Sequence, residues 1–465
     1  MERLSPLDAA FLEAEDADRH VSMAIASIAV FEGPAPTYEE FSAAIAARLP
    51  RVPRYRQRVR TVPLRLGPPV WVDDPDFDLG YHIRQVSLPA PGGDTELARM
   101  MAEVMAQRLD RDRPLWEDWL VTGLAGDHWA VISKVHHCMV DGVSGTDLYR
   151  VMFDQAPGTI EASAAAAPPS ELAGGPSETG LLVRAALGTL LLPARATGAL
   201  LHLVAHPGPA WQALRDTTRA ARAASASLPP ARTSSLSGPI GQQRRYAWAT
   251  ATLDDIRQVK RELGGTVNDV VLAAITAGFR ALLLSRGEDT QPHMLPSLVP
   301  VSLRPPGGES VYDNEVSAMI VDLPVHVADP VEQLSAIRHQ LGALKAANEA
   351  EAGDTLIRLA GFVPYNPWAA LVRAGFRIPQ REIVTVTTNV PGPRTTLYCL
   401  GRPMLQILPY VPLGSRVRIG VAIFSYRDAI TFGITGDYDT THDLEVLAYG
   451  IRDGLADLLK SAGDR

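Results

Sequence analysis

The first 155 residues alternate between short apolar runs and segments whose apolar side chains recur at helical spacing. Phe41, Ile45 and Leu49 lie four residues apart and predict a helix over residues 38–49. A stripe of methionines predicts a second helix over residues 95–109, and we interpret the stripe as core packing. The other predicted elements of this region are strands at residues 22–31 and 129–135 and a helix at residues 144–153. The mixture predicts an α/β unit.

A second mixed pattern begins near residue 244 and continues to the C-terminus. Its most apolar segment is a helix predicted over residues 270–286, which opens after Asn268 and Asp269. Predicted strands lie at residues 246–253, 295–303, 316–323, 383–389, 418–424 and 429–434, and further helices at residues 253–263 and 442–459. The pattern predicts a second α/β unit.

The composition changes between these two units. Residues 161–178 and 225–243 are rich in Ala, Pro, Ser and Gly, which is typical of linkers, and they flank a Leu- and Ala-rich, helix-prone stretch. We therefore predict an N-terminal domain at 1–160, a linker and basic helical connector at 161–243, and a C-terminal domain at 244–465.

The connector has a charge opposite to that of the whole chain. Residues 180–225 contain five arginines and one aspartate, a net +4, whereas the chain has a formal net charge of −8. Arg215, Arg219 and Arg222 fall on one helical face, which is either a solvated surface or a contact with an anionic membrane or lipid-droplet surface. The overall negative charge argues against a nucleic-acid partner.

Two cysteines in 465 residues suggest neither a disulfide framework nor a zinc site and favour a cytosolic protein. The N-terminus shows no secretory signal. The longest uncharged stretch, residues 196–214, is interrupted by His, Pro and Gly, so we expect no transmembrane helix.

The chemistry concentrates in the segment His136-His137-Cys138-Met139-Val140-Asp141-Gly142, directly after a predicted buried strand. This HHxxxDG pattern supplies an imidazole base, an acid four residues later and a glycine that lets the backbone approach closely, a set suited to removing a proton from an attacking hydroxyl. Three alternatives remain open: satisfied polar residues at a strand end, metal ligands, or a Cys138 nucleophile. The chain contains no GxSxG, GxGxxG or GxxxxGK[ST] motif, which argues against a lipid hydrolase and a nucleotide-binding site.

The HHxxxDG segment resembles the motif of the bacterial wax ester synthase/acyl-CoA:diacylglycerol acyltransferases, in the wider group of chloramphenicol acetyltransferase and condensation domains. Further segments resemble this family in family order: residues 4–12 (LSPLDAAFL), Pro114-Leu115-Trp116, residues 265–272 with Asn268 and Asp269, residues 299–305 with Arg304, and residues 388–393 with Thr388 and Asn389. The resemblance implies two chloramphenicol-acetyltransferase-like domains, each a mixed sheet packed with helices. A crossover would join them, and a tunnel would run between them.

The resemblance also implies roles for single residues. His137 would be the general base, His136 would shape the turn or line the tunnel, and Asp141 would hold the structure by pairing with Arg304. The backbone near Gly142 or the Asn268 side chain would stabilise the oxyanion, although Asn268 and Asp269 are equally typical of a helix N-cap. The residues expected to line the tunnel are Pro114, Leu115, Trp116, Thr388 and Asn389, with core packing or a turn as their structural interpretation.

The implied activity is acyl transfer from acyl-CoA to diacylglycerol or a long-chain alcohol, without a cofactor or metal. An acyltransferase or condensation enzyme fed by a carrier protein is the alternative, and a non-catalytic lipid-droplet coat protein is another. We expect a cytoplasmic protein in peripheral contact with the inner membrane or lipid droplets.

Overall fold

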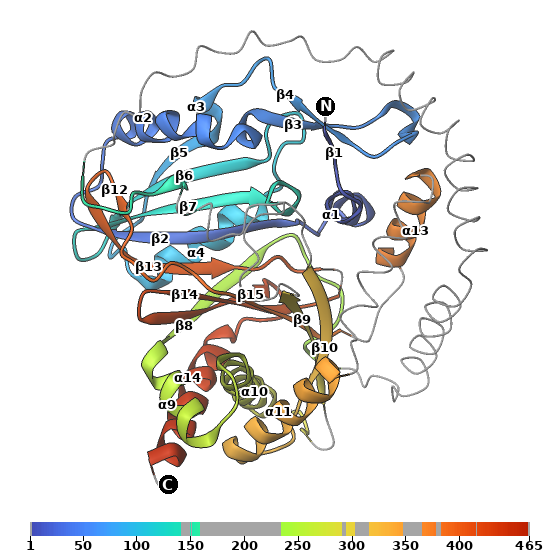
Figure 1. The fold of residues 1–465 in the computed structure, drawn as a ribbon, viewed down its shortest axis with the longest axis vertical. Coiled ribbons are helices and arrows are strands. Elements are labelled where there is room, and N and C mark those ends of the chain that lie inside the picture. The colour runs from blue at the N-terminus through green and yellow to red at the C-terminus, as the bar shows by residue number, and fades with distance from the viewer. Residues whose placement is uncertain are drawn as a thin grey trace.

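The computed structural model describes residues 2–140, 149, 151–158, 234–290, 294–302, 316–346, 365–377, 383–414 and 416–463. Two six-stranded mixed sheets form its frame, with helices packed against them, and a three-stranded sheet lies near the N-terminus (Figure 1). The predicted α/β class with two mixed sheets is confirmed.

The first sheet carries the histidine motif at the end of a central strand, in the order β12-β13-β2-β7-β6-β5. β5 pairs parallel with β6, and the other pairs are antiparallel. Its strands are β2 (Ala24–Glu32), β5 (Ile83–Ser87), β6 (Trp116–Leu124), β7 (His128–His136), β12 (Tyr398–Cys399) and β13 (Arg402–Tyr410). The elements around it are β1 (Glu2–Arg3), β3 (Gln57–Arg60), β4 (Val70–Asp73), α1 (Pro6–Ala17), α2 (Tyr38–Arg48), α3 (Leu79–His82), α4 (Asp94–Ala106) and short 3₁₀ turns η1 (Leu49–Arg51), η2 (Pro53–Arg56), η3 (Pro63–Arg65) and η4 (His137–Met139).

The second sheet has the order β10-β9-β11-β14-β15-β8, with β11 parallel to both of its neighbours. Helices α9, α10, α11 and α14 lie on the side of this sheet away from the first sheet (Figure 1). The elements are β8 (Arg244–Thr252), α9 (Leu253–Leu263), α10 (Val267–Ser285), β9 (Leu295–Ser302), β10 (Val316–Leu323), α11 (Pro330–Ala346), α13 (Tyr365–Arg377), β11 (Thr385–Val390), β14 (Ile419–Tyr426), β15 (Ala429–Asp437) and α14 (Leu444–Gly463).

Helix α10 is the central core helix of the second unit. It is the one helix in the described part of the chain that is long and apolar enough to cross a membrane, yet 67% of its apolar window is buried inside the protein. Its buried side chains share a core cluster with those of α14, for example Phe279 with Leu447 and Ile451. The hydrophobicity of α10 is therefore accounted for by core packing.

Strand β13 crosses from the second unit into the first sheet. It follows β11 in the chain, but its ladder partner is β2, and Tyr246 of β8 donates a hydrogen bond to its Pro409 carbonyl over 2.7 Å. The backbones come so close here that a Cβ on Gly433 of β15 would lie 1.7 Å from the Pro409 oxygen. The domain boundaries stay predictions, and β12 and β13, from the predicted C-terminal domain, complete the first sheet.

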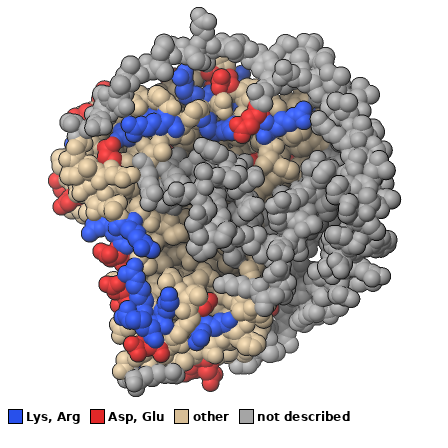
Figure 2. Space-filling model, viewed as in Figure 1, with Lys and Arg blue, Asp and Glu red and all other residues tan. Residues whose placement is uncertain are grey.

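Most predicted elements match observed ones, for example residues 38–49 with α2 and 270–286 with α10. The prediction missed β6, whose acidic residues Glu117 and Asp118 interrupt its apolar pattern, and β13, which contains two prolines. The basic connector, and residues 144–148 of the helix predicted after the motif, lie outside the described residues. On the face seen in Figure 2, basic and acidic side chains lie beside one another.

Candidate active site

The two histidines of the motif lie where β7 ends and the η4 turn begins. β7 is held on both sides, with His136 paired to Ala24 of β2 and its N–H donating to the Leu115 carbonyl over 2.9 Å. The next residue, His137, donates its backbone N–H to Met23 across 3.0 Å. A central strand with partners on both sides therefore positions the turn rigidly.

The hydrogen bonds of His136 define its tautomer. The Cys138 backbone N–H donates to His136 Nδ1 over 3.2 Å, so this nitrogen carries a lone pair and the proton of the neutral ring is on Nε2. Nε2 lies 3.4 Å from the Oε1 atom of Glu15. His136 is 2% exposed, so it is a buried side chain held between the turn and a carboxylate rather than a free base.

Glu15 of α1 is the charged centre of the site, and sequence analysis did not find it. Its Oε1 accepts a hydrogen bond of 2.7 Å from the Met23 N–H, and its Oε2 lies 3.0 Å from the Arg111 guanidinium. Burial alone would raise the pKa of Glu15, but His136, the Met23 N–H and Arg111 outweigh burial and lower it to about 2. Glu15 is therefore an ionised carboxylate at neutral pH, although only 3% exposed.

His137 differs from its neighbour in having an apolar contact and no acidic partner among the residues that the structure describes. Its ring lies 4.1 Å from the Phe11 ring of α1, at an angle of 30°. Its Nδ1 has no hydrogen-bond partner among the described residues. Burial, followed by the electrostatic effect of the neighbouring His136, lowers the pKa of His137 to about 4. The half-buried ring is thus a neutral imidazole at neutral pH, as a general base must be.

The signal that could have revealed Glu15 and Phe11 is the opening segment of the chain. Asp8, Glu13 and Glu15 occupy the same short helix as the buried Ala9 and Leu12, and all three acids are themselves buried. Acidic residues on a helix usually face solvent. Only the tertiary structure, which places their partners beside them, shows that the acidic side chains of this helix point into the protein.

Cys138 does not have the surroundings of a nucleophile. The thiol is 1% exposed, and burial, together with the negative charges of Asp8 and Glu15, raises its pKa well above the ordinary value. Because the thiolate is the reactive form, such a thiol is inert. The alternative of a cysteine nucleophile is therefore not supported.

Asp141, Gly142 and Arg304 lie outside the described residues, so the Asp141–Arg304 pair and an oxyanion donor at Gly142 stay predictions.

Pro114, Leu115 and Trp116 are buried. Trp116 stacks on Tyr55 and His82, with ring centroids 4.6 and 4.5 Å away. Its Nε1 donates to the Tyr55 carbonyl over 2.8 Å. These are the contacts of a core residue and account for the segment without a substrate.

The predicted residues of the second unit gather where α10 begins and β11 ends. Asn389 Nδ2 donates to Asn268 Oδ1 over 3.1 Å, and Thr388 precedes Asn389 on β11. Asp269 instead caps α10: its carboxylate accepts the Thr266 N–H over 2.7 Å, and Thr266 Oγ1 accepts the Asp269 N–H over 3.2 Å. Within the described residues, no hydrogen bond joins these side chains to His137. Their roles toward a substrate stay predictions.

The capping geometry predicts the behaviour of an Asp269→Ala variant. Loss of one half of the capping box should lower the free energy of unfolding by about 1 kcal/mol, with turnover nearly unchanged, because the side chain serves the helix end. Denaturant unfolding and a turnover assay check this, and Thr266→Ala, which removes the reciprocal cap, is the matched control. A large loss of turnover at normal stability would contradict the capping role.

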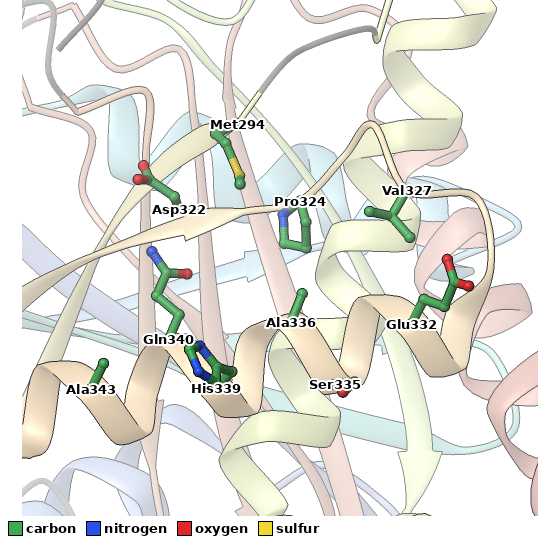
Figure 3. Close-up of a pocket in the computed structure, with 10 residues that line it drawn as sticks. All are labelled: Met294, Asp322, Pro324, Val327, Glu332, Ser335, Ala336, His339, Gln340 and Ala343. Atoms are coloured by element: carbon green, nitrogen blue, oxygen red, sulfur yellow. The ribbon is translucent and has the colours of Figure 1, made fainter. Parts of the chain in front are cut away.

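A groove lies elsewhere, between β10 and α11 of the second unit (Figure 3). It has a volume of about 760 Å³. The residues that line it are Met294, Asp322, Pro324, Val327, Glu332, Ser335, Ala336, His339, Gln340 and Ala343. None of the predicted site residues lines this groove, so it is not the predicted tunnel, which stays a prediction.

Comparisons with known proteins point to one family. Residues 4–271 match the wax ester synthase/diacylglycerol acyltransferase catalytic domain, and residues 312–459 match the C-terminal domain of the same family. The chain is 42% identical to a probable diacylglycerol O-acyltransferase of Mycobacterium tuberculosis, over 99% of this chain and 96% of that protein. A second relative in that organism, a putative diacylglycerol O-acyltransferase, is 34% identical over 100% of this chain and 92% of its own length.

Solved structures show the same fold. The wax ester synthase/diacylglycerol acyltransferase of Marinobacter aquaeolei VT8 superposes with a TM-score of 0.68 at 27% identity, covering 99% of this chain and 100% of that chain. The first condensation domain of the calcium-dependent antibiotic synthetase superposes with a TM-score of 0.63 at 15% identity, covering 100% and 96%. At that identity the second likeness concerns the fold alone.

Proposed function

The chain belongs to the wax ester synthase/diacylglycerol acyltransferase family, and from this premise we propose that it transfers a long-chain acyl group from acyl-CoA to an alcohol. The acceptor is diacylglycerol, a long-chain alcohol, or both, so that the product is triacylglycerol or wax ester. The observation that carries the proposal is a neutral imidazole, His137, presented beside Phe11 in a turn that the surrounding contacts hold in place.

We propose His137 as the general base of the reaction. The imidazole takes the hydroxyl proton of the acceptor as the alcohol oxygen attacks the thioester carbonyl carbon. A new C–O bond forms, the C–S bond breaks, and the imidazolium returns the proton to the CoA sulfur. The reaction needs neither a covalent acyl-enzyme nor a metal or cofactor, and acyl-CoA is itself a substrate.

His136 and Glu15 hold the turn in this proposal. Because the ring of His136 is fixed by the Cys138 N–H on one side and faces Glu15 on the other, it is a positioning residue and not a second base. Asp141 with Arg304, and Gly142 or Asn268 as oxyanion donors, complete the proposed site.

The location is also proposed. The protein is cytoplasmic and contacts the inner membrane or a lipid-droplet surface through the arginine-bearing connector, residues 180–225. That contact would bring an apolar acceptor to the enzyme, since arginines meet anionic head groups while apolar faces bury. The remaining alternative is a donor bound to a carrier protein.

The experiment uses purified full-length protein, palmitoyl-CoA and a panel of acceptors: dipalmitoylglycerol, 1-hexadecanol and no acceptor. We expect acceptor-dependent release of free CoA together with triacylglycerol or wax ester, followed with a thiol reagent and by lipid chromatography. Ester formation only from palmitoyl-carrier protein would favour the alternative donor. CoA release without ester would mean hydrolysis, and a protein without activity that still binds lipid droplets would favour a coat protein.

A further inference from the structure

A row of polar side chains crosses the interior of the first sheet. Asp118 of β6, Ser133 of β7 and Ser27 of β2 occupy directly paired register positions. Directly paired residues project to the same face of a sheet, so the three lie side by side. The Tyr149 hydroxyl, seven residues beyond Gly142, adds a hydrogen bond to the Ser27 hydroxyl. We name these four residues the Asp118 cluster.

The Asp118 cluster faces away from α4. Lys134, the neighbour of Ser133 on β7, sends its amine to the Val104 and Gln107 carbonyls at the end of α4, over 2.8 and 2.6 Å. Successive residues of a strand point to opposite faces, so Ser133 points to the other side. On that side the Tyr149 ring lies 5.4 Å from Phe424 of β14, in the second sheet. Tyr149 therefore brings the cluster into contact with the second unit.

The carboxyl of Asp118 is unusual for this interior. It is 3% exposed, within a core cluster that includes Leu120 and Val131. Burial raises its pKa to about 6, and a hydrogen bond with Ser133 partly offsets the effect of burial. No arginine or lysine in the described part of the chain forms an ion pair with it. Burying a carboxyl without a cation beside it costs free energy of folding. We therefore expect this carboxyl to serve a function.

The Asp118 carboxylate has capacity for further hydrogen bonds. A carboxylate offers about four lone-pair positions, and the Ser133 hydroxyl uses one of them. Ser133 and Tyr149 are half-buried, so each keeps surface that a bound molecule can reach. Because carboxylate oxygens only accept, the missing partners are O–H or N–H donors.

The cluster and His137 are within reach of one substrate. Ser133 precedes His137 by four residues, and a strand rises about 3.3 Å per residue, so the two lie about 13 Å apart along β7. Acyl-CoA and lipid acceptors are long molecules. When the reacting end of such a molecule lies at His137, the rest of it can extend along the sheet. A polar group at that distance from the reacting carbon would meet the cluster.

We propose that Asp118, Ser133, Ser27 and Tyr149 form a subsite that binds an O–H or N–H group of a substrate whose reacting end lies at His137. The inference rests on the proposed function and adds a residue set that determines substrate preference. Two substrate groups have the required chemistry: the amide N–H and hydroxyl groups of the CoA arm, and the extra free hydroxyl of a monoacylglycerol, an acceptor with one hydroxyl more than the diacylglycerol of the proposed reaction.

The test measures dissociation constants for CoA, monopalmitoylglycerol and 1-hexadecanol with wild-type protein and with Asp118→Asn and Tyr149→Phe, two substitutions that conserve shape. We expect the dissociation constant of one donor-bearing ligand to rise about tenfold in Asp118→Asn, the effect of losing one hydrogen bond to a charged group. A rise for CoA assigns the subsite to the acyl donor. A rise for monopalmitoylglycerol, with 1-hexadecanol unchanged, assigns it to the acceptor.

Asp322→Asn is the matched control, because this half-buried carboxyl lines the separate groove of Figure 3 and its pKa is also raised by burial. Thermal unfolding of each variant shows that binding is compared between folded proteins, and Ser133→Ala gives a second reading if Asp118→Asn does not fold. Unchanged dissociation constants for both donor-bearing ligands in folded variants would overturn the proposal. Because binding is measured without turnover, this outcome is distinct from a failure of the acyltransferase assay.

Discussion

Replacing His137 by alanine is expected to lower kcat by about 10²–10⁴-fold, the range that general-base catalysis contributes. The structure supports an effect of this size because the ring is a neutral imidazole held against Phe11, with Nδ1 free of partners in the described structure. The loss should appear in kcat rather than in the affinity for palmitoyl-CoA, because the imidazole accepts the hydroxyl proton in the transition state. Initial rates of ester formation measure it.

The control for His137→Ala is His128→Ala, which removes an imidazole at the opposite end of β7 and should leave the rate unchanged. A pH profile of the wild-type enzyme adds a second measurement. Because the pKa of His137 is lowered to about 4, the base stays unprotonated across the neutral range, and kcat/KM should fall only as the pH approaches 4. A normal rate in His137→Ala would exclude the residue as the base.

Replacing Glu15 by alanine is expected to cost about 3 kcal/mol in the free energy of unfolding and to reduce turnover as well. Breaking a buried ion pair typically costs about 3–5 kcal/mol, and the lower end applies because Arg111 is partly exposed and keeps Asp16 as a partner. The substitution also leaves the Met23 N–H without its acceptor and frees the ring of His136. Denaturant unfolding gives the stability loss, and kcat gives the effect on the turn.

Two variants separate these contributions. Glu15→Gln keeps an oxygen acceptor for Met23 but removes the charge, so it should retain more stability than Glu15→Ala. Glu32→Ala, at the exposed end of β2, is the surface control. Since the pKa of Glu15 is lowered to about 2 in the folded state, its contribution is complete above the ordinary carboxyl range and is lost as the pH falls toward 2. A Glu15→Ala protein of wild-type stability and rate would show that the carboxylate does not support the site.

The structure adds contacts that bear on the prediction in three places. Trp116 was expected either to wall the tunnel or to pack in the core, and its stacking on Tyr55 and His82 is core packing. Asp269 was named beside Asn268 as a supporting residue, and its carboxylate caps α10. The segment with β12 and β13 was assigned to the C-terminal unit, and it pairs with β2. For Trp116 and for β13 a contact between segments distant in the chain decided the outcome, whereas the Asp269 cap is a local contact with Thr266.

The order of amino acids by itself determined the local elements, the mixed-sheet class and the position of the histidine motif, because side-chain periodicity is a local property of helices and strands. Family resemblance added the activity. Only the tertiary structure decided that the Glu15 carboxylate faces His136, that Phe11 covers His137, and that Asp118 lies buried beside Ser133. Burial and long-range pairing set the charge state of these groups, and neither can be read from the spacing of residues along the chain.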